Sequence, residues 1–445
     1  MENGRKRRWW TRVAVVGLCA VSNPASAQDR VLTLQEALDL AFQQHPTMEA
    51  SRRTVEATRE EEGVAFAGFL PSVTLDATYT RATGNQVPTP GALFAAGTSR
   101  STKSYNFFQF SLNLRQSIWD FGRTLGAVEA SEARTDAARN DGETTRLQTW
   151  FQVTTAYHGV VAAQKMVLLA QRLRDQALFH ARRARELYDA GARPKIDVTR
   201  TEAAAQMAEA GYVTADQGLS LARNILLSAI GTKDRFGFQV SDPPRPAPES
   251  PPPNLEEAVA DALARRPERR AFLDRVRFEQ AQLSRIRGDY FPQLFAFGSA
   301  SEAGVRMDDL VWNWALGVGL TYPVFSGLAT HHGVRAQEAR LAALKAGLEA
   351  LDLSIRSEVE QALSRVTEAS ARIPPARAAV TAARETLSLA EDRYRLGEGD
   401  QLELLDAQGA VAQAEAALVR AEYDLAVAWT AFWRATGRMP EVGGE

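Results

Sequence analysis

Few side chains in this chain have the types and spacing that chemistry requires. Glu403 and Asp406 are three residues apart, so a helix would place both carboxylates on one face. His331 and His332 could coordinate a metal, but they directly follow a predicted strand and we interpret them as a solvated pair. The chain has no GxxxxGK, HExxH or GxSxG motif, and its six methionines are dispersed. We therefore predict no catalytic residue, no cofactor and no metal site.

Charge gathers at two points where the chain is predicted to turn between helices. The first turn is basic, with Arg182, Arg183, Arg185, Arg193 and Lys195, and the second is acidic, with Glu398, Asp400, Glu403 and Asp406. Asp400 and Glu403 also fit a helix-capping box, which would give them a purely structural role. The alternative for the acids as a group is that they are ordinary solvated side chains.

Composition excludes several classes of protein. The chain has 445 residues, of which 45% are hydrophobic and 24% charged, and its net charge is −2. These values exclude a disordered tail and a collagen-like fibre, and the charge makes nucleic acid an improbable partner. No run of about 18 to 20 apolar residues is present, which excludes a helical membrane protein.

Residues 1–27 are predicted to be a signal peptide. A basic leader up to Arg12 precedes the apolar run 13–21, and Ala25-Ser26-Ala27 resembles a cleavage site. Cleavage would leave an exported chain with a net charge of −6 and no cysteine, hence no disulfide. The alternative is a lipid anchor on Cys19, but the preceding Leu18 stands where lipoprotein processing requires Gly, Ala or Ser.

The chain contains one internal repeat. The segment LQEALDLAFQQHP at 34–46 returns as LEEAVADALARRP at 255–267, and Glu132-Ala133-Arg134 returns as Glu338-Ala339-Arg340. We predict two structural repeats, 28–240 and 255–437, followed by a C-terminal tail, 438–445. A proline-rich connector, 241–254, joins the repeats, and the first repeat carries an extra surface loop, GNQVPTPGALFAAGTSRS.

Each repeat is predicted to contain the same elements. These are short helices over 34–44 and 255–264, second helices ending at Pro71 and Pro292, strand hairpins over about 72–119 and 293–325, long helices over 124–187 and 328–394, and return helices over 195–230 and 401–436. Apolar residues recur strictly every seven positions in both return helices, which predicts a left-handed coiled coil. Pro374 and Pro375 should bend the second long helix and act as a hinge.

The hairpins have one apolar and one polar face, because apolar residues alternate with polar ones. The stretch 294–301 departs from this pattern, since Phe295 and Phe297 fall on the side that should be polar. Aromatic residues lie at or near the strand ends, as membrane-interface girdles do: Trp119, Trp312, Trp314 and Tyr322. Strands can cross a bilayer only as a closed barrel, and four are too few, so several copies must contribute. The alternative is a soluble hairpin packed under helices.

At this point the sequence resembles the TolC-like outer-membrane efflux proteins of Gram-negative bacteria, the outer membrane factors. The resemblance rests on the duplicated LxxAhxxAxxxxP opening, the FLP and YFP helix ends, SIWDFG with its partner PVFSG, and RYRLGEGDQLELLDAQ. It implies a mainly α fold and a homotrimer in which a 12-stranded β-barrel continues as a 12-helix α-barrel. It also implies a place in the outer membrane, a tunnel projecting into the periplasm, and two partners, a periplasmic adaptor protein and an inner-membrane pump.

The resemblance also implies roles for residues at the turns. Asp197, Tyr394, Glu403 and Asp406 resemble residues of the closed periplasmic entrance, and threefold symmetry would turn the last two into stacked carboxylate rings that attract cations. An arginine common in some relatives falls at Gly399, so its ion pair is expected to be absent or supplied by Arg193 or Arg200. Residues expected to help dock the adaptor are Gly191, Arg193, Lys195, Gly397, Glu398 and Asp400.

We therefore predict an exit duct of a tripartite efflux or type I secretion system, gated at its helical tips and not itself an enzyme. An enzyme with a barrel would need a convergent cluster of titratable groups, which the motifs do not supply. The other alternative is an exported coiled-coil protein of the cell envelope without channel activity, which would have no reason to contain period-two strands.

Overall fold

The computed structural model describes residues 30–83, 103–232, 238–242, 254–396, 398–399 and 401–440. The predicted signal peptide with Cys19, the predicted loop 84–101, most of the proline-rich connector and the end of the C-terminal tail lie outside the described residues. Within the described residues, the same order of elements occurs twice: two helices, a 3₁₀ turn, two strands and two long helices.

The first half opens with elements whose ends the sequence defines locally. They are β1 (Arg30–Leu32), α1 (Leu34–Gln44), α2 (Pro46–Phe66) and the 3₁₀ turn η1 (Ala67–Phe69). The Thr33 hydroxyl accepts from the Glu36 N–H while the Glu36 carboxylate accepts from the Thr33 N–H, which completes a capping box for α1. Pro46 occupies the first position of α2, where a missing N–H removes no helical hydrogen bond.

The second helices of the two halves end at Phe66 and Arg287, ahead of the predicted Pro71 and Pro292, because a 3₁₀ turn follows each. The other helices end close to their predicted limits. The first half continues with β2 (Ser72–Thr83), β3 (Ser104–Trp119), α3 (Arg123–Asp189), α4 (Lys195–Ile230) and β4 (Phe238–Val240). The second half contains α5 (Leu255–Arg265), α6 (Pro267–Arg287), η3 (Gly288–Tyr290), β5 (Gln293–Arg306), β6 (Asp309–Thr321), α7 (Ala329–Leu396) and α8 (Gln401–Ala435). Strand β5 is longer than the predicted 294–301, because its pairing with β6 continues to Arg306.

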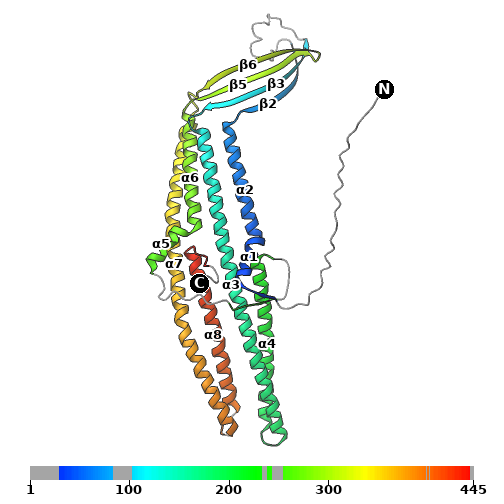
Figure 1. Cartoon of the computed structure of the whole chain (residues 1–445), viewed down its shortest axis with the longest axis vertical. Coiled ribbons are helices and arrows are strands. Elements are labelled where there is room, and N and C mark those ends of the chain that lie inside the picture. The colour runs from blue at the N-terminus through cyan, green and yellow to red at the C-terminus, as the bar shows by residue number, and fades with distance from the viewer. Residues whose placement is uncertain are drawn as a thin grey trace, which may run out of the picture.

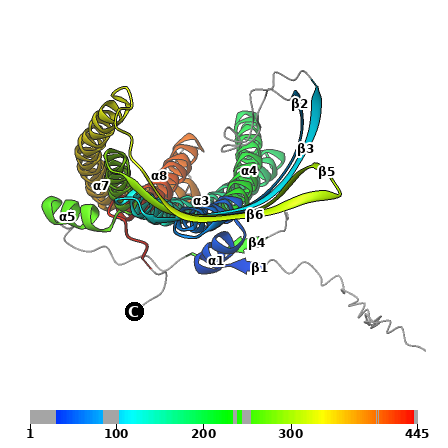
Figure 2. The same cartoon turned by 90° about the horizontal axis from the view of Figure 1, so that it is seen from above.

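Strands β2, β3, β5 and β6 form one antiparallel sheet in that order, with β2 and β6 at its edges. The register aligns the predicted faces across all four strands. One row on the apolar face consists of Leu75, Leu112, Ala300 and Trp314, and the next row, on the polar face, consists of Asp76, Ser111, Ser301 and Asn313. The sheet is strongly curved, with α4 and α8 on its concave side and α1 on its convex side (Figure 2).

The helices form a long wall that continues from one end of the sheet (Figure 1). Helix α3 packs against α4, α6 and α8, and α7 packs against α6 and α8. Tyr157 and Leu226 are central in one buried cluster, which α1 covers, while Val359 and Phe432 are central in a second, which α5 covers. Within the described residues, no helix combines the length and apolar composition needed to cross a lipid bilayer.

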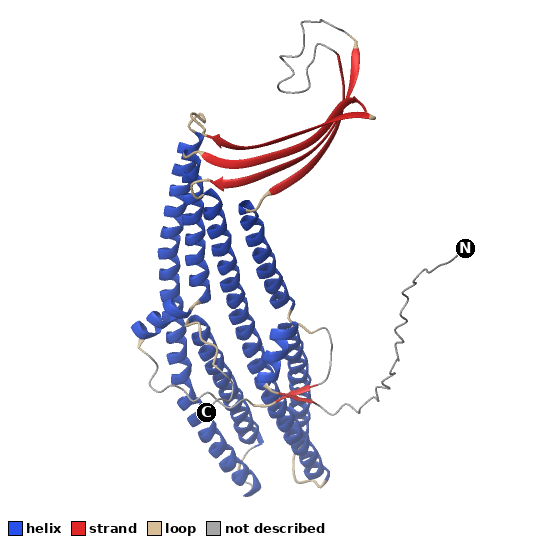
Figure 3. Ribbon diagram, turned by 45° about the horizontal axis from the view of Figure 1, so that its top comes forward, coloured by secondary structure: helices blue, strands red, loops and turns tan. Residues whose placement is uncertain are grey.

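A second, two-stranded sheet was missed by the sequence analysis. Strands β1 and β4 pair in parallel, with Leu32 opposite Val240, and Figure 3 shows them halfway along the helices, far from the large sheet. Leu32 and Phe238 are fully buried, and the Tyr157 hydroxyl lies 2.9 Å from the Leu32 carbonyl oxygen and 2.8 Å from that of Ser241. Three-residue strands are too short to show a period, so only the packing reveals them.

The same glycine joint occurs in both halves. Gly231 and Gly437 follow α4 and α8 with φ of +82° and +72°, in the left-handed region. A Cβ on Gly231 would lie 2.8 Å from His45 Cα, and a Cβ on Gly437 would lie 3.1 Å from Arg266 N. His45 and Arg266 directly precede the first residues of α2 and α6, Pro46 and Pro267. The end of α4 therefore packs against the start of α2, and the end of α8 packs against the start of α6 in the same way.

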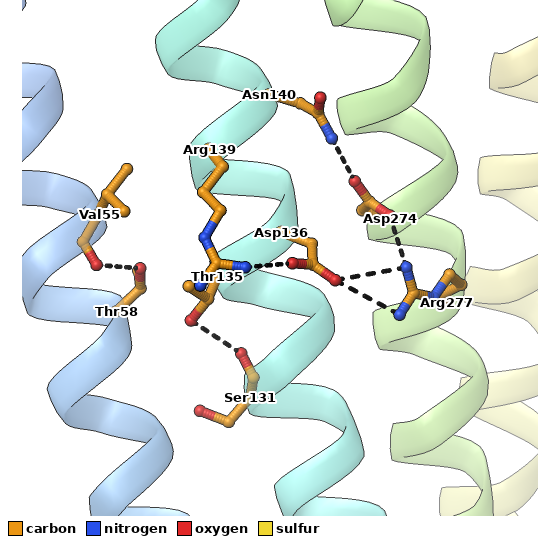
Figure 4. A network of polar contacts seen from close by, with 9 residues as sticks. All are labelled: Val55, Thr58, Ser131, Thr135, Asp136, Arg139, Asn140, Asp274 and Arg277. Carbon is orange, nitrogen blue, oxygen red and sulfur yellow. Dashed lines mark hydrogen bonds and ion pairs between the residues drawn. The ribbon is translucent and has the colours of Figure 1, made fainter.

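Polar side chains join α3 to α6 across the upper wall (Figure 4). Asn140 Nδ2 donates to Asp274 Oδ2 over 2.7 Å, and Arg277 lies 2.9 Å from the other oxygen of the same carboxylate. Asp274 is only 7% exposed. Because a buried carboxylate is tolerated only with such partners, this network fixes the side-by-side placement of the two helices.

Candidate functional site

The first helical tip is a tight turn between α3 and α4. Gly191 has a φ of +71°, which favours glycine, and its N–H donates to the Tyr188 carbonyl over 2.9 Å. The Ala192 N–H donates to the Leu187 carbonyl over 2.8 Å. These bonds end α3 in a Schellman-like turn, and Pro194 then starts α4.

The second tip, between α7 and α8, turns around Gly399. The N–H groups of Glu398 and Gly399 both donate to the Arg393 carbonyl over 3.0 Å. A Cβ on Gly399 would lie 2.9 Å from Tyr394 N, so this turn leaves no room for a side chain such as arginine. Gly397 and Asp400 lie outside the described residues, as does any capping bond from Asp400.

The four predicted entrance residues lie at these tips but do not form one cluster. Glu403 and Asp406 share an exposed face of α8, while Leu404 and Ala407 are buried on the other side. Asp197 is 5% exposed in the first turn of α4. Among the described residues, no hydrogen bond or ion pair joins Asp197 to Glu403 or Asp406.

Arginines connect the acidic and aromatic groups of the tips. Arg393 Nη1 lies 2.7 Å from Glu403 Oε1, so this arginine and this carboxylate form an ion pair across the turn of the second tip. Arg193 instead places its guanidinium 5.0 Å from the centre of the Tyr394 ring, a cation–π contact between the two tips. The sequence analysis missed Arg393 because its partner lies across the turn, and only the hairpin geometry brings them together.

The other charges of the tips are mostly exposed. Lys195 and Glu398 are exposed, and Arg193 is half-buried. Arg183 pairs with Glu186 within α3, and Arg185 Nη1 lies 3.1 Å from Glu202 on α4. Such exposed pairs contribute little to stability.

Above the tips, polar contacts join the first helical hairpin to α8. His180 Nε2 lies 2.8 Å from Gln408 Nε2, which requires an unprotonated ring nitrogen that accepts from the amide. Burial lowers the pKa of His180 and favours that form. Lys165 Nζ lies 2.8 Å from Asp242 and 3.5 Å from Glu422 on α8, so it links α8 to the residues that follow β4.

The predicted hinge lies within an unbroken helix. Helix α7 continues through Pro374 and Pro375 from Ala329 to Leu396. Its lower part is inclined to its upper part (Figure 1), and Ile373 and Val380, on either side of the prolines, are buried. A role for the two prolines in movement stays a prediction.

In the single chain the apolar face of the sheet is exposed, most of all along its edge strands β2 and β6. Trp119 and Trp312 are each 60% exposed, and Trp314 is 68% exposed. Trp119 is the last residue of β3 and Tyr322 directly follows β6. Trp314, which we predicted to lie at or near a strand end, is five residues into β6 and therefore closer to the middle of the sheet.

The histidine pair offers no metal site of its own. The rings of His331 and His332 lie 5.3 Å apart near the start of α7. Across the portion of the chain that the structure describes, no group of three or more His, Cys, Asp or Glu residues is arranged to hold a metal ion.

Comparison with known proteins agrees with this geometry. The family model described as "Outer membrane efflux protein" matches residues 37–232 and 258–438. The chain is 26% identical to the outer membrane efflux protein BepC of Brucella suis over 413 residues, which cover 92% of this chain and 86% of the relative. It is 25% identical to the outer membrane protein OprJ of Pseudomonas aeruginosa over 421 residues, or 91% and 84% of the two chains.

The fold is also that of solved outer-membrane channels. The structure of the outer-membrane channel OprN superimposes with a TM-score of 0.78, at 22% identity over 91% of this chain and 89% of that one. Both matched ranges of the family model include a helical tip, and together they span most of the described residues. The chain therefore belongs to the outer membrane efflux protein family.

Proposed function

We propose that this chain is one subunit of a homotrimeric channel in the outer membrane, the exit duct of a tripartite efflux or type I secretion system. The observation that carries the proposal is the large sheet, which is curved and apolar on one face, and whose edge strands β2 and β6 each have a free side among the described residues. Three copies would pair β6 of each with β2 of the next and close a barrel of twelve strands.

The helices supply the remainder of the duct. In the lower wall each copy contributes α3, α4, α7 and α8, so that three copies would form a ring of twelve helices below the barrel. The order of elements, which is the same in both halves, supports two structural repeats per chain and a ring of nearly equivalent helix pairs. This arrangement would project the tips into the periplasm.

We place the gate at the tips. In a trimer the exposed Glu403 and Asp406 would form two rings of carboxylates around a narrow axis, and like charges at such spacing attract cations. Arg393 neutralises part of the first ring through its ion pair with Glu403. The contact between Arg193 and Tyr394 holds the two tips of one subunit together, and it would have to break if they separate on opening.

The tips are also the proposed docking surface for a periplasmic adaptor, which connects the duct to an inner-membrane pump. The charges that support this role are Arg193 and Lys195 on one tip and Glu398 on the other. The pump would supply the energy for transport.

The assembly can be tested on the purified protein in lipid nanodiscs. Light scattering should give a protein mass three times that of the chain, and the same preparation should conduct ions in planar bilayers. A stable monomer that remains in solution without lipid or detergent would contradict the proposal, because its apolar sheet face would then need no membrane.

A further inference from the structure

The two phenylalanines that break the alternation of β5 lie on the polar face of the sheet. Phe295 is opposite Gly319 and Phe297 is opposite Gly317 on β6. A Cβ on Gly319 would lie 2.6 Å from Phe295 Cζ, and a Cβ on Gly317 would lie 2.7 Å from Phe297 Cζ. The rings therefore lie over positions without side chains, and any larger residue there would displace them.

Arg115 of β3 completes this cluster. Its guanidinium carbon lies 4.0 Å from the centre of the Phe295 ring, and the register places Arg115 opposite Phe297. The two rings are 6.1 Å apart. Arg115, Phe295 and Phe297 thus form one aromatic and cationic surface, which we call the Arg115 cluster.

Among the described residues, the guanidinium of Arg115 has no acidic partner. No carboxylate of the described residues lies within ion-pair distance of its guanidinium, and no described acceptor takes a hydrogen bond from it. The acid on the same face of the neighbouring strand, Asp76, is four rows along the sheet from Arg115 and accepts a hydrogen bond from Asn113 over 2.8 Å. Because Arg115 is exposed, its guanidinium N–H groups can donate to a solute in the surrounding solvent.

The position of the cluster gives it access to cargo. Arg115 is opposite Ser72, the first residue of β2, so the cluster lies at the end of the sheet that joins the helices. The opposite face carries Leu75, Trp314 and Leu316, which suit lipid and not water. If the proposed trimer forms, the Arg115 cluster therefore lines the lumen where the barrel meets the helical tunnel.

We propose that the Arg115 cluster is a binding site for aromatic anions, such as aromatic carboxylates and sulfonates, on their way through the duct. A guanidinium binds a carboxylate or sulfonate through paired N–H donors, and Phe297, 39% exposed, offers a ring face to the aromatic part. The inference rests on the proposed function, since it requires the polar face of the sheet to be the inner one.

The test uses a single thiol beside the cluster in the trimer in nanodiscs. Cys19 is the only cysteine, so Ser117→Cys in a Cys19→Ser chain gives one thiol on the face of Arg115, two residues away. The rates of reaction with an anionic sulfonatoethyl and a cationic trimethylammonioethyl methanethiosulfonate are compared at low salt. The positive charge of Arg115, about 7 Å from the thiol in water, should raise the local concentration of the anionic reagent about threefold and lower that of the cationic reagent about threefold. Arg115→Gln should therefore lower the anionic-to-cationic rate ratio about ninefold.

The matched control is Arg81→Gln, which removes the same charge near the far end of β2, on the apolar face, and should leave the ratio unchanged. Naphthalene sulfonate should protect the thiol at concentrations where methanesulfonate does not, and Phe297→Ser should abolish this difference. Equal rate ratios with and without Arg115, or equal protection by both sulfonates, would overturn the inference.

Failure of the proposed function gives a different result. With Leu114→Cys, on the apolar face, the charged reagents should not react in nanodiscs, whereas Ser117→Cys should react. If Leu114→Cys reacts and Ser117→Cys does not, the faces of the sheet are reversed and both the barrel proposal and the inference fail. If only Ser117→Cys reacts, but without dependence on Arg115, the barrel proposal stands and the inference fails.

Discussion

At the scale of single residues, an arginine at the second tip pairs with one of the two carboxylates of the proposed entrance. Glu403 is held by Arg393 over 2.7 Å, whereas Asp406 has no described partner. The two carboxylates are therefore not equivalent, although their spacing in the sequence puts them on the same face of α8.

We predict that Glu403→Gln combined with Asp406→Asn lowers the preference of the channel for cations, because it removes both proposed carboxylate rings. Arg393→Gln should raise that preference by releasing Glu403. The measurement is the reversal potential of single channels in a salt gradient. Arg372→Gln, far from the tips on α7, is the matched control for loss of an arginine. Unchanged selectivity in both entrance variants would remove these residues from the entrance.

His158 links stability to pH. Burial lowers the pKa of His158 from its usual 6.5 to about 4. Between these values the unfolded chain binds a proton that the folded chain does not, so folding stability falls as the pH drops from above 6.5 towards 4. The contribution of His158 is present at pH 7 and is lost on acidification.

We therefore predict that His158→Gln reduces the loss of stability between pH 7 and pH 5 by about 1 to 2 kcal/mol. The measurement is the free energy of unfolding in urea at the two pH values. His331→Gln, at an exposed position of α7, should leave the pH dependence as in the wild type. An equal pH dependence of wild type and His158→Gln would show that His158 is not buried as the structure places it.

At the scale of elements, the seam between α3 and α6 depends on polar side chains as well as on packing. Asp274 is nearly buried and joins Asn140 to Arg277. The pairs along these helices include Arg275 with Asp141, in which both side chains are about half exposed. Loss of the nearly buried Asp274 contacts should therefore cost more folding stability than loss of the half-exposed pair of Arg275 with Asp141.

Asp274→Leu should destabilise the folded protein by about 1 to 3 kcal/mol, because it leaves Asn140 without its acceptor in a buried site. Urea unfolding measures the effect, and Asn140→Leu in the same chain should recover part of it, as a double-mutant cycle requires. Glu368→Leu, which breaks an exposed pair with Arg372, should change stability by less than about 1 kcal/mol. If Asp274→Leu and Glu368→Leu change the free energy of unfolding equally, the polar contacts between α3 and α6 contribute no more to stability than an exposed ion pair.

At the scale of the whole molecule, the chain is a curved sheet at one end and two charged tips at the other, joined by helices of up to 68 residues. In the part of the chain that the structure describes, β2 and β6 each have a free edge, and both tips carry exposed charges. Both ends therefore agree with the proposal that other chains complete the molecule, at the sheet by closing a barrel and at the tips by docking.

We predict that Arg193→Glu and Glu398→Arg each lower crosslinking to the adaptor and export severalfold, and that the losses depend on ionic strength. Arg193 also contacts Tyr394, so Arg193→Gln separates loss of that contact from reversal of charge. Arg372→Glu, away from the tips, is the control. If both reversals leave crosslinking and export unchanged, these charges serve only solubility.

The sequence by itself determined the long helices and the four strands of the large sheet, and the apolar face of most of them. The repeated 34–46 and 255–267 segments, the heptads of α4 and α8 and the alternation in the hairpins are local patterns, and a local pattern reflects the environment of each face. That is why α4 begins and ends where the pattern predicted, at Lys195 and Ile230.

Only the tertiary structure decided which faces meet. The pairing of β3 with β5, the pair of β1 and β4, the ion pair of Arg393 with Glu403 and the seating of Phe295 and Phe297 on glycines all join positions apart in the chain. The periodicity of a segment does not identify these partners. The register between strands and the choice of neighbouring element depend on the sum of many weak contacts between segments that are distant in the sequence. The same physics explains why the phenylalanines that broke the pattern in the sequence became a defined surface in the fold.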